Sequence, residues 1–326
     1  MKATNREGWK RRAVALWVVM ASISFGLSGC GKKGDGAGET PHEGKPRIVA
    51  TSTMLTDLVK ALAGDDAEVA GLMAPGVDPH TYEMPARAIA QIRGSDAVFY
   101  NGFLLEGKMA DVLEPMAAQG KAVVAVAEAL PRDQVIQPEN FEGHADPHVW
   151  GDVQLWKQTV PTVREALQHL MPEKADAIAA RADAYSTELD ALDAWIRERI
   201  ALVPEANRLL VTSHDAFTYF GRAYGFEVIG VQGISTAADA GIADIVNTVD
   251  LVKSRGVKAI FVESSVSRAT IERIAKDAGV VIGGELYSDS CGPAGQMETA
   301  AGETYDKGTY IGMMKHNVNA MVEALK

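Results

Sequence analysis

The stretch between Pro172 and Pro204 constrains the fold more than any other part of the chain, because it contains neither glycine nor proline. Apolar residues recur along it at spacings of three and four, which marks one face of a helix: Ile178, Ala182, Tyr185, Leu189, Leu192, Ile196, Ile200 and Val203. At about 1.5 Å per residue, such a helix reaches about 45 Å, more than about twice the average length. We therefore expect it to join two lobes. A coiled-coil helix with a partner is the alternative, although the stripe covers little more than about four heptads.

Short apolar runs alternate with helical patterns on both sides of this helix. Before it, the patterns predict strands at 47–51, 69–73, 97–100 and 122–126, and helices at 54–62, 85–92, 106–118 and 153–169, the last with Pro161 as a point of bending. After it, they predict strands at 208–212, 227–229, 259–263 and 280–282, and helices at 217–224, 243–254, 270–278 and 311–325. Continuous apolar strands between helices are typical of parallel sheets covered on both faces.

The fold class that follows is α/β with two lobes. Each lobe is expected to hold a mainly parallel sheet flanked by helices, and one long rigid helix is expected to join the lobes, with the ligand site in the cleft between them. We place the N-terminal lobe at 47–171, the linking helix at 172–204 and the C-terminal lobe at 205–326.

The N-terminus has the layout of a secretory signal. Basic residues precede an apolar run from Ala13 to Phe25 that is too short to span a bilayer comfortably; they are Lys2, Arg6, Lys10, Arg11 and Arg12. The run ends in Leu27-Ser28-Gly29-Cys30, which resembles the lipobox of bacterial lipoproteins. We expect residues 1–29 to be removed and Cys30 to carry the lipid, and a short anchor with a chance cysteine is the alternative. Residues 30–46 are mostly glycine and charge, as in a flexible tether.

The net charge limits the classes of molecule that the protein can bind, and the cysteine count limits its disulfides. Cleavage before Cys30 removes five basic residues and one acidic residue, so the net charge of −11 becomes −15. A chain this acidic is a poor match for nucleic acid or an anionic membrane surface, and a reasonable match for cations. With Cys30 lipidated, Cys291 has no partner for an internal disulfide, so stability must come from packing and from bound ligand.

The tripeptide Asp-Pro-His occurs twice, ending at His80 and at His148. Proline fixes its own φ near −65° and biases the preceding residue toward extended structure, so each imidazole lies on a stiffened loop. A metal ligand needs this fixed position. The alternative for either copy is a turn with a solvated histidine.

Two further candidates follow predicted strands, as His80 does. His214 follows the strand at 208–212, and Asp289 follows the strand at 280–282. Because ligands of open parallel sheets gather at the carboxyl ends of strands, two side chains from each lobe could meet across the cleft. Three nitrogens and one oxygen suit zinc and are workable for manganese. Taken singly, His214 is equally explained by the first turn of a helix capped by Ser213, and Asp289 by a turn.

The remaining chemical side chains receive lesser roles. We expect His144 to be solvated, His169 to be structural at the end of a helix and His316 to lie on a helix surface, and we assign no role to His42. Cys291 is an alternative soft ligand. Glu263 and Glu285, near strand ends, are candidates to accept a hydrogen bond from the second nitrogen of a ligating histidine.

Six motifs, in order, resemble those of the zinc- and manganese-binding lipoproteins of bacterial ABC importers, which include the treponemal and pneumococcal metal-binding proteins. They are Ala74-Pro-Gly-Val-Asp-Pro-His80-Thr-Tyr-Glu, Phe99-Tyr-Asn-Gly with Leu105-Glu-Gly, Asp146-Pro-His148-Val-Trp, Thr212-Ser-His214-Asp-Ala-Phe-Thr-Tyr-Phe, Val231-Gln-Gly-Ile-Ser-Thr and Gly283-Gly-Glu-Leu-Tyr-Ser-Asp289. The resemblance covers the chain from about Arg47 to its C-terminus.

The resemblance implies two α/β lobes joined by a rigid helix, one metal held by His80, His148, His214 and Asp289, and delivery of Zn²⁺ or Mn²⁺ to an ABC permease by a monomeric, exported, membrane-anchored protein. In this family a glutamate at the third ligand position is associated with manganese, whereas this chain has His214. The histidine-rich loop frequent in zinc-dedicated members is also missing. Zinc is the first expectation and manganese the second.

Two other functions are alternatives. A metallohydrolase would need an open coordination position and a general base, and the motif H-E-x-x-H is absent, so we expect no enzyme activity. An adhesin or a siderophore binder on the same fold would need an open aromatic or basic pocket instead of a closed ligand set.

Overall fold

The computed structural model describes residues 44–139, 141 and 143–326. The first half of the chain folds around a four-stranded parallel sheet. Its order is β2-β1-β3-β4, formed by β1 (Arg47–Ala50), β2 (Glu68–Gly71), β3 (Ala97–Tyr100) and β4 (Ala122–Ala125). The predicted signal segment and Cys30 lie outside the described residues.

Both faces of this sheet are covered by helices. Side chains alternate between the two faces along each strand, so neighbouring residues pack into different clusters. Ile48 and Ala50 of β1 belong to the largest apolar cluster, which they share with α1 (Thr53–Ala63) and α5 (Val160–Leu170). Val49 points to the opposite face and packs with residues of α2 (Ala86–Arg93) and α3 (Ala110–Ala118). The prediction of strands buried on both sides is confirmed for the central strands β1 and β3, whereas the edge strands β2 and β4 are partly exposed.

The second half also has parallel pairing, but in two two-stranded sheets instead of the one sheet expected: β5 (Leu209–Thr212) with β6 (Glu227–Gly230), and β7 (Ala259–Glu263) with β8 (Val281–Leu286). β5 and β7 are neighbours in contact. Leu210 and Phe261 face the largest cluster, together with α7 (Thr218–Tyr224) and α10 (Tyr310–Leu325). Val211 and Ile260 face α8 (Ile242–Arg255) and α9 (Ala269–Ala278).

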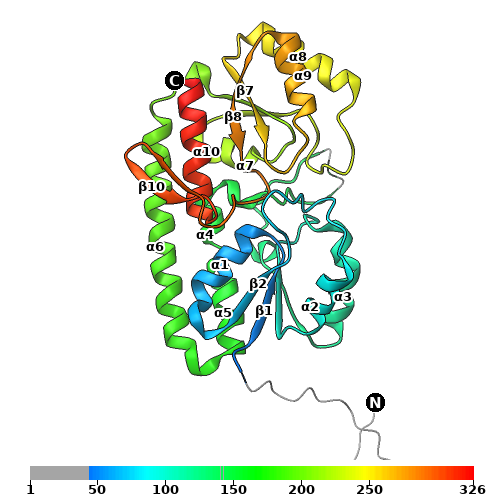
Figure 1. Cartoon of the computed structure of the whole chain (residues 1–326), viewed down its shortest axis with the longest axis vertical. Helices are drawn as coiled ribbons and strands as arrows, with labels where there is room; N and C mark the ends of the chain where they lie inside the picture. The colour runs from blue at the N-terminus through cyan, green and yellow to red at the C-terminus, as the bar shows by residue number, and fades with distance from the viewer. Residues whose placement is uncertain (1–43, 140, 142) are drawn as a thin grey trace, which may run out of the picture. The chain divides into compact units, whose positions relative to one another are not determined.

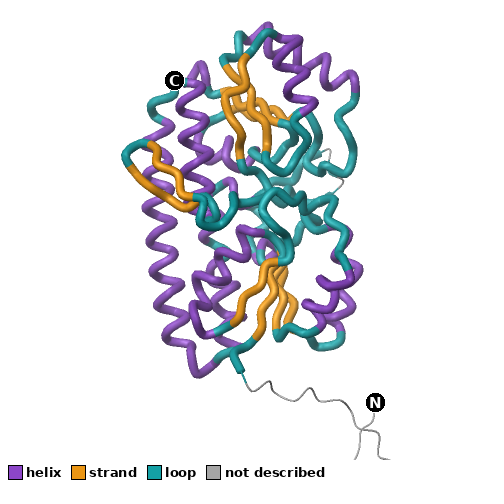
Figure 2. Tube along the Cα trace, viewed as in Figure 1, coloured by secondary structure: helices purple, strands orange, loops and turns teal. Residues whose placement is uncertain are grey.

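The long helix α6 (Ala175–Ile200) follows a 3₁₀ turn at Pro172–Lys174, and the seven apolar residues of its stripe between Ile178 and Ile200 are all buried. The stripe packs against α1, α5, α10 and the short helix α4 (Val153–Lys157) of the same chain. Its apolar face is therefore covered by helices of the same chain, and a coiled-coil helix from a second chain is not needed to bury it. Figures 1 and 2 show α6 running past both groups of strands.

Two parts of the chain differ from the sequence prediction. The helix expected at 153–169 is two helices, α4 and α5, because Pro161 occupies the first turn of α5 and lacks the N–H that a continuous helix needs. A hairpin of β9 (Met297–Ala300) and β10 (Glu303–Asp306) was not predicted. Its turn has positive φ at Ala301 and Gly302, and Ala-Gly is not one of the sequences that usually mark such a turn.

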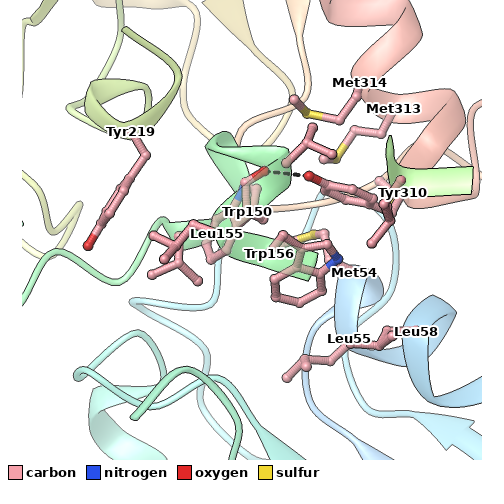
Figure 3. Packing of buried hydrophobic residues seen from close by; sticks show 14 of the residues in the cluster. Met54, Leu55, Leu58, Trp150, Leu155, Trp156, Tyr219, Tyr310, Met313 and Met314 are labelled. Atoms are coloured by element: carbon pink, nitrogen blue, oxygen red, sulfur yellow. Dashed lines mark hydrogen bonds between the residues drawn. The ribbon is translucent and has the colours of Figure 1, made fainter. Parts of the chain in front are cut away.

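One apolar core joins the two halves on the side of α6. Figure 3 shows Trp156 of α4 between residues of α1 and of α10. The ring of Trp156 lies 5.5 Å from that of Tyr310, whose hydroxyl donates to the carbonyl of Trp150 at 2.7 Å. This core fixes the carboxyl ends of the strands of both halves relative to one another.

Candidate metal centre

The four side chains singled out in the sequence lie together. One ligand atom each of His80, His148, His214 and Asp289 falls within 4.8 Å of the other three. His80 lies on the loop after β2, His148 immediately before a 3₁₀ turn at Val149–Gly151, His214 after β5 and Asp289 after β8. All four are buried, and His80, at 6% exposed, is the most accessible.

The ring nitrogens Nε2 of the three histidines point toward one another and toward the carboxylate. Nε2 of His80 lies 3.2 Å from Nε2 of His148. The two oxygens of Asp289 lie on either side, with Oδ1 3.4 Å from Nε2 of His148 and Oδ2 3.2 Å from Nε2 of His214. The centre thus offers three nitrogens and one carboxylate.

The two Asp-Pro-His motifs fold alike at the backbone. In each, the aspartate accepts the backbone N–H of its own histidine at 2.9 Å. They differ at the ring, because Asp146 also lies 2.7 Å from Nδ1 of His148. Oδ2 of Asp78 instead accepts the hydroxyls of Thr81 and Thr236. His148 is therefore held by a carboxylate at its second nitrogen, and His80 is not held by Asp78 in this way.

His214 is held as His148 is. Glu263, the last residue of β7, accepts the backbone N–H of His214 at 2.8 Å and lies 2.5 Å from its Nδ1. A carboxylate in this place fixes the tautomer and the orientation of a ligating imidazole and makes it a stronger donor. The role expected for Glu263 is thus supported by the geometry. Glu285, the other candidate, pairs at the surface with Arg268 instead, and Asp146 was not singled out for this role.

The electrostatics distinguish the three imidazoles. Burial lowers the pKa of His80 to about 4, so its ring is neutral. Burial also opposes the charge on His148, but the Asp146 carboxylate, with Asp289, raises its pKa to about 9. Burial acts in the same sense on His214, and Glu263 and Asp289 overcome it, so its pKa lies well above the usual value. Despite burial, His214 and His148 hold the pKa of Asp289 well below its usual value.

Two buried atoms of this group have no hydrogen-bond partner, Oδ1 of Asp289 and Nε2 of His214. Buried polar atoms are nearly always paired, so orphans that point into a ring of ligand atoms indicate a place for a cation. The donor set suits zinc in tetrahedral geometry. Cys291 lies outside the group; burial raises the pKa of its thiol, and its backbone N–H donates to Thr53.

The substitution Glu263→Gln tests the support of His214. The amide keeps the size of the side chain and removes the charge that fixes the imidazole, so we expect metal to bind about 10–100-fold more weakly. Glu285→Gln is the matched control, because Glu285 pairs with Arg268 at the surface, and it should leave the affinity unchanged. Titration of stripped protein with a competing chelator measures both. Equal affinities in the two variants would contradict the role of Glu263.

Of the other histidines that the structure describes, His144, His169 and His316 lie outside this group. His144 is exposed, as expected, with its ring 5.8 Å from that of Phe141. His316 lies on α10 and is partly exposed, in keeping with the helix-surface position expected for it, and it also has two polar contacts. Its Nδ1 lies 2.8 Å from Oε2 of Glu298 and its Nε2 lies 3.0 Å from the carbonyl of Glu285. The unpredicted hairpin supplies Glu298, so the sequence held no clear signal for this pair.

The chain was compared with known families and proteins. Residues 48–324 match the family model described as zinc-uptake complex component A, periplasmic. The chain belongs to this family. Two curated relatives are each 42% identical to it. The manganese-binding lipoprotein MntA of Bacillus subtilis aligns over 316 residues, 94% of this chain and 99% of that protein. The zinc-binding protein TroA of Treponema pallidum aligns over 295 residues, 89% and 92%.

Membership in this family agrees with the resemblance stated from the motifs. The solved structure of the Treponema pallidum protein TroA superposes with a TM-score of 0.81 at 42% identity, covering 86% of this chain and 99% of that one. The α/β class with a long helix is therefore confirmed. The chain is also similar to the iron-binding protein YfeA of Yersinia pestis, with 28% identity over 313 residues, 96% of each chain. Because relatives are named for different metals, membership alone does not select the metal. The family consists of solute-binding proteins.

Proposed function

We propose that this protein captures one divalent transition metal ion outside the cytoplasm and delivers it to the permease of an ABC importer. Zinc is the first candidate and manganese the second, and the ligands are His80, His148, His214 and Asp289. The observation that carries the proposal is the buried cluster of four convergent ligand atoms, two of which lack any hydrogen-bond partner. Relatives named for zinc and for manganese support it.

The closed ligand set favours capture over catalysis. A catalytic zinc usually has three protein ligands and keeps one position for water, whereas four side chains surround this centre and all are buried. The metal is therefore cargo and the protein is not an enzyme. In this proposal residues 47–171 and 205–326 act as two lobes that enclose the ion, with the linking helix at 172–204 limiting their relative motion.

The sequence around Cys30 and the names of the relatives support the proposed location. Several relatives are named lipoproteins, MntA among them. No helix among the described residues is long and apolar enough to cross a membrane. In our proposal residues 1–29 are removed, Cys30 carries a lipid, and residues 30–46 connect a monomeric binding unit to the membrane surface facing the periplasm or the cell exterior.

Metal analysis of protein purified without added metal tests this function. We expect about one ion per chain in the wild type and none in the double variant His80→Ala, His214→Ala, because removal of two of four ligands opens the centre. The matched control is His144→Ala, since His144 is exposed and lies outside the group. Competition between zinc and manganese for stripped protein then identifies the preferred ion. Equal metal content in the wild type and the double variant would contradict the proposal.

A further inference from the structure

The two oxygens of Asp289 have different surroundings. Oδ2 lies 3.3 Å from the hydroxyl of Ser265, which donates to it, and 3.2 Å from Nε2 of His214. Oδ1 faces Nε2 of His148 at 3.4 Å and has no hydrogen-bond partner. Oδ2 thus has a hydroxyl donor from the protein, whereas Oδ1 faces only the imidazole of His148.

Ser265 is itself held in place. Its Oγ lies 2.9 Å from Oγ of Ser288, and Ser288 is 1% exposed, with its carbonyl accepting the indole N–H of Trp150 at 2.8 Å. Ser288 can donate to Ser265 while Ser265 donates to Asp289, since each hydroxyl has one proton and two acceptor sites. Ser265 follows β7, the same strand that ends in Glu263. One strand end therefore supports both second-half members of the centre.

The number of carboxylate oxygens that reach the metal changes its coordination number. Three imidazoles and one oxygen make a tetrahedral site, the geometry that zinc takes most often. Both oxygens together raise the coordination number to five, toward the higher coordination that manganese prefers. A hydrogen bond donated to one oxygen draws charge from that oxygen and makes it the weaker metal ligand of the two. Its loss leaves both oxygens available.

We propose that Ser265 determines metal preference by engaging Oδ2 of Asp289, which leaves Oδ1 as the single oxygen ligand and favours zinc over manganese. This inference rests on the proposed function, because it assumes that Asp289 binds the metal. It adds a residue that does not touch the ion and acts by positioning a ligand.

The experiment compares the wild type with Ser265→Ala, Ser265→Thr and Ser288→Ala. For each protein, competition titration gives the ratio of zinc to manganese affinity, and the visible absorption of the Co²⁺-loaded form reports coordination number, since tetrahedral Co²⁺ absorbs far more strongly than five- or six-coordinate Co²⁺. Ser264→Ala is the matched control, because Ser264 is the neighbouring serine and its buried hydroxyl has no hydrogen-bond partner.

We expect Ser265→Ala to lower the zinc-to-manganese ratio by about 10-fold, the lower end of what loss of an outer partner costs, and to weaken the Co²⁺ absorption. Ser265→Thr, which keeps the hydroxyl, should retain both values, and Ser288→Ala should fall between. If Ser265→Ala and Ser288→Ala bind metal with the ratio and spectrum of Ser264→Ala, the inference is wrong and the proposed function stands. Equal weakening of both metals, with an unchanged spectrum, also overturns it. Failure of the wild type to bind either metal overturns the proposed function itself.

Discussion

Replacing Asp289 with asparagine is expected to weaken metal binding by more than about 100-fold, beyond the range typical of supporting residues. Asparagine keeps the shape of the side chain and removes the only negative charge within the ligand group. A neutral amide oxygen is a weaker ligand for a divalent ion, and in this buried site water does not replace the lost attraction, because a low local dielectric strengthens each charge. The loss should fall on zinc and manganese alike.

The control for this change is Asp215→Asn. Asp215 adjoins His214 in the sequence, is partly buried, and accepts the hydroxyl of Thr218 at 2.5 Å, but it is not in the ligand group. It removes one negative charge close to the centre without removing a ligand, so we expect less than about a tenfold loss, the size of a modest electrostatic effect. Chelator competition measures both variants. Equal losses would mean that Asp289 contributes only through its charge and does not coordinate the ion.

The position of the centre could be predicted because its signals are local. Proline in each Asp-Pro-His motif stiffens a loop, and His214 and Asp289 follow β5 and β8 within two or three residues. Parallel strands bring such residues to one edge. The helix α6 could also be predicted, because its apolar residues recur at helical spacing. Seven of them are buried in the structure.

The supporting contacts could not be predicted, because they depend on packing between segments far apart in the sequence. The two Asp-Pro-His motifs have the same sequence, but only Asp146 lies against the ring of its histidine. Asp78 instead accepts a hydrogen bond from Thr236, in the other half of the chain. Ser265 reaches Asp289 only because β7 and β8 are paired. Glu285 lies near a strand end as Glu263 does, but its side chain is at the surface. The difference lies in which face of its strand each side chain points to. The sequence alone does not reveal this.

Metal affinity is expected to fall steeply as the pH is lowered, because metal binds neutral imidazoles, whereas the carboxylates around His148 and His214 raise the pKa of both rings and favour their protonated forms. The pKa of His148 is about 9 and that of His214 lies well above its usual value, whereas that of His80 is about 4. At pH 7 binding should thus release about two protons, and affinity should fall by about 100-fold per pH unit. Three histidines at the ordinary pKa of ~6.5 would release less than about one proton together.

Calorimetric titration at pH 7 in two buffers of different protonation enthalpy counts these protons. Glu263→Gln should release fewer, because His214 loses the carboxylate that raises its pKa. A value near zero for the wild type would show that both rings are already neutral and would contradict the charge assignment. The slope of affinity against pH, measured from 6 to 8, provides an independent count.

The same pKa values make the stability of the metal-free protein depend on pH in the opposite sense. His148 is raised to about 9 in the folded state from ~6.5 when unfolded, so its contribution is fully present below pH ~6.5 and is lost as the pH rises through about 9. The thermal midpoint of stripped protein should therefore fall between pH 7 and pH 9, while the stabilisation added by saturating metal should grow. Parallel curves for stripped and loaded protein would show that metal and protons do not compete for the same nitrogens.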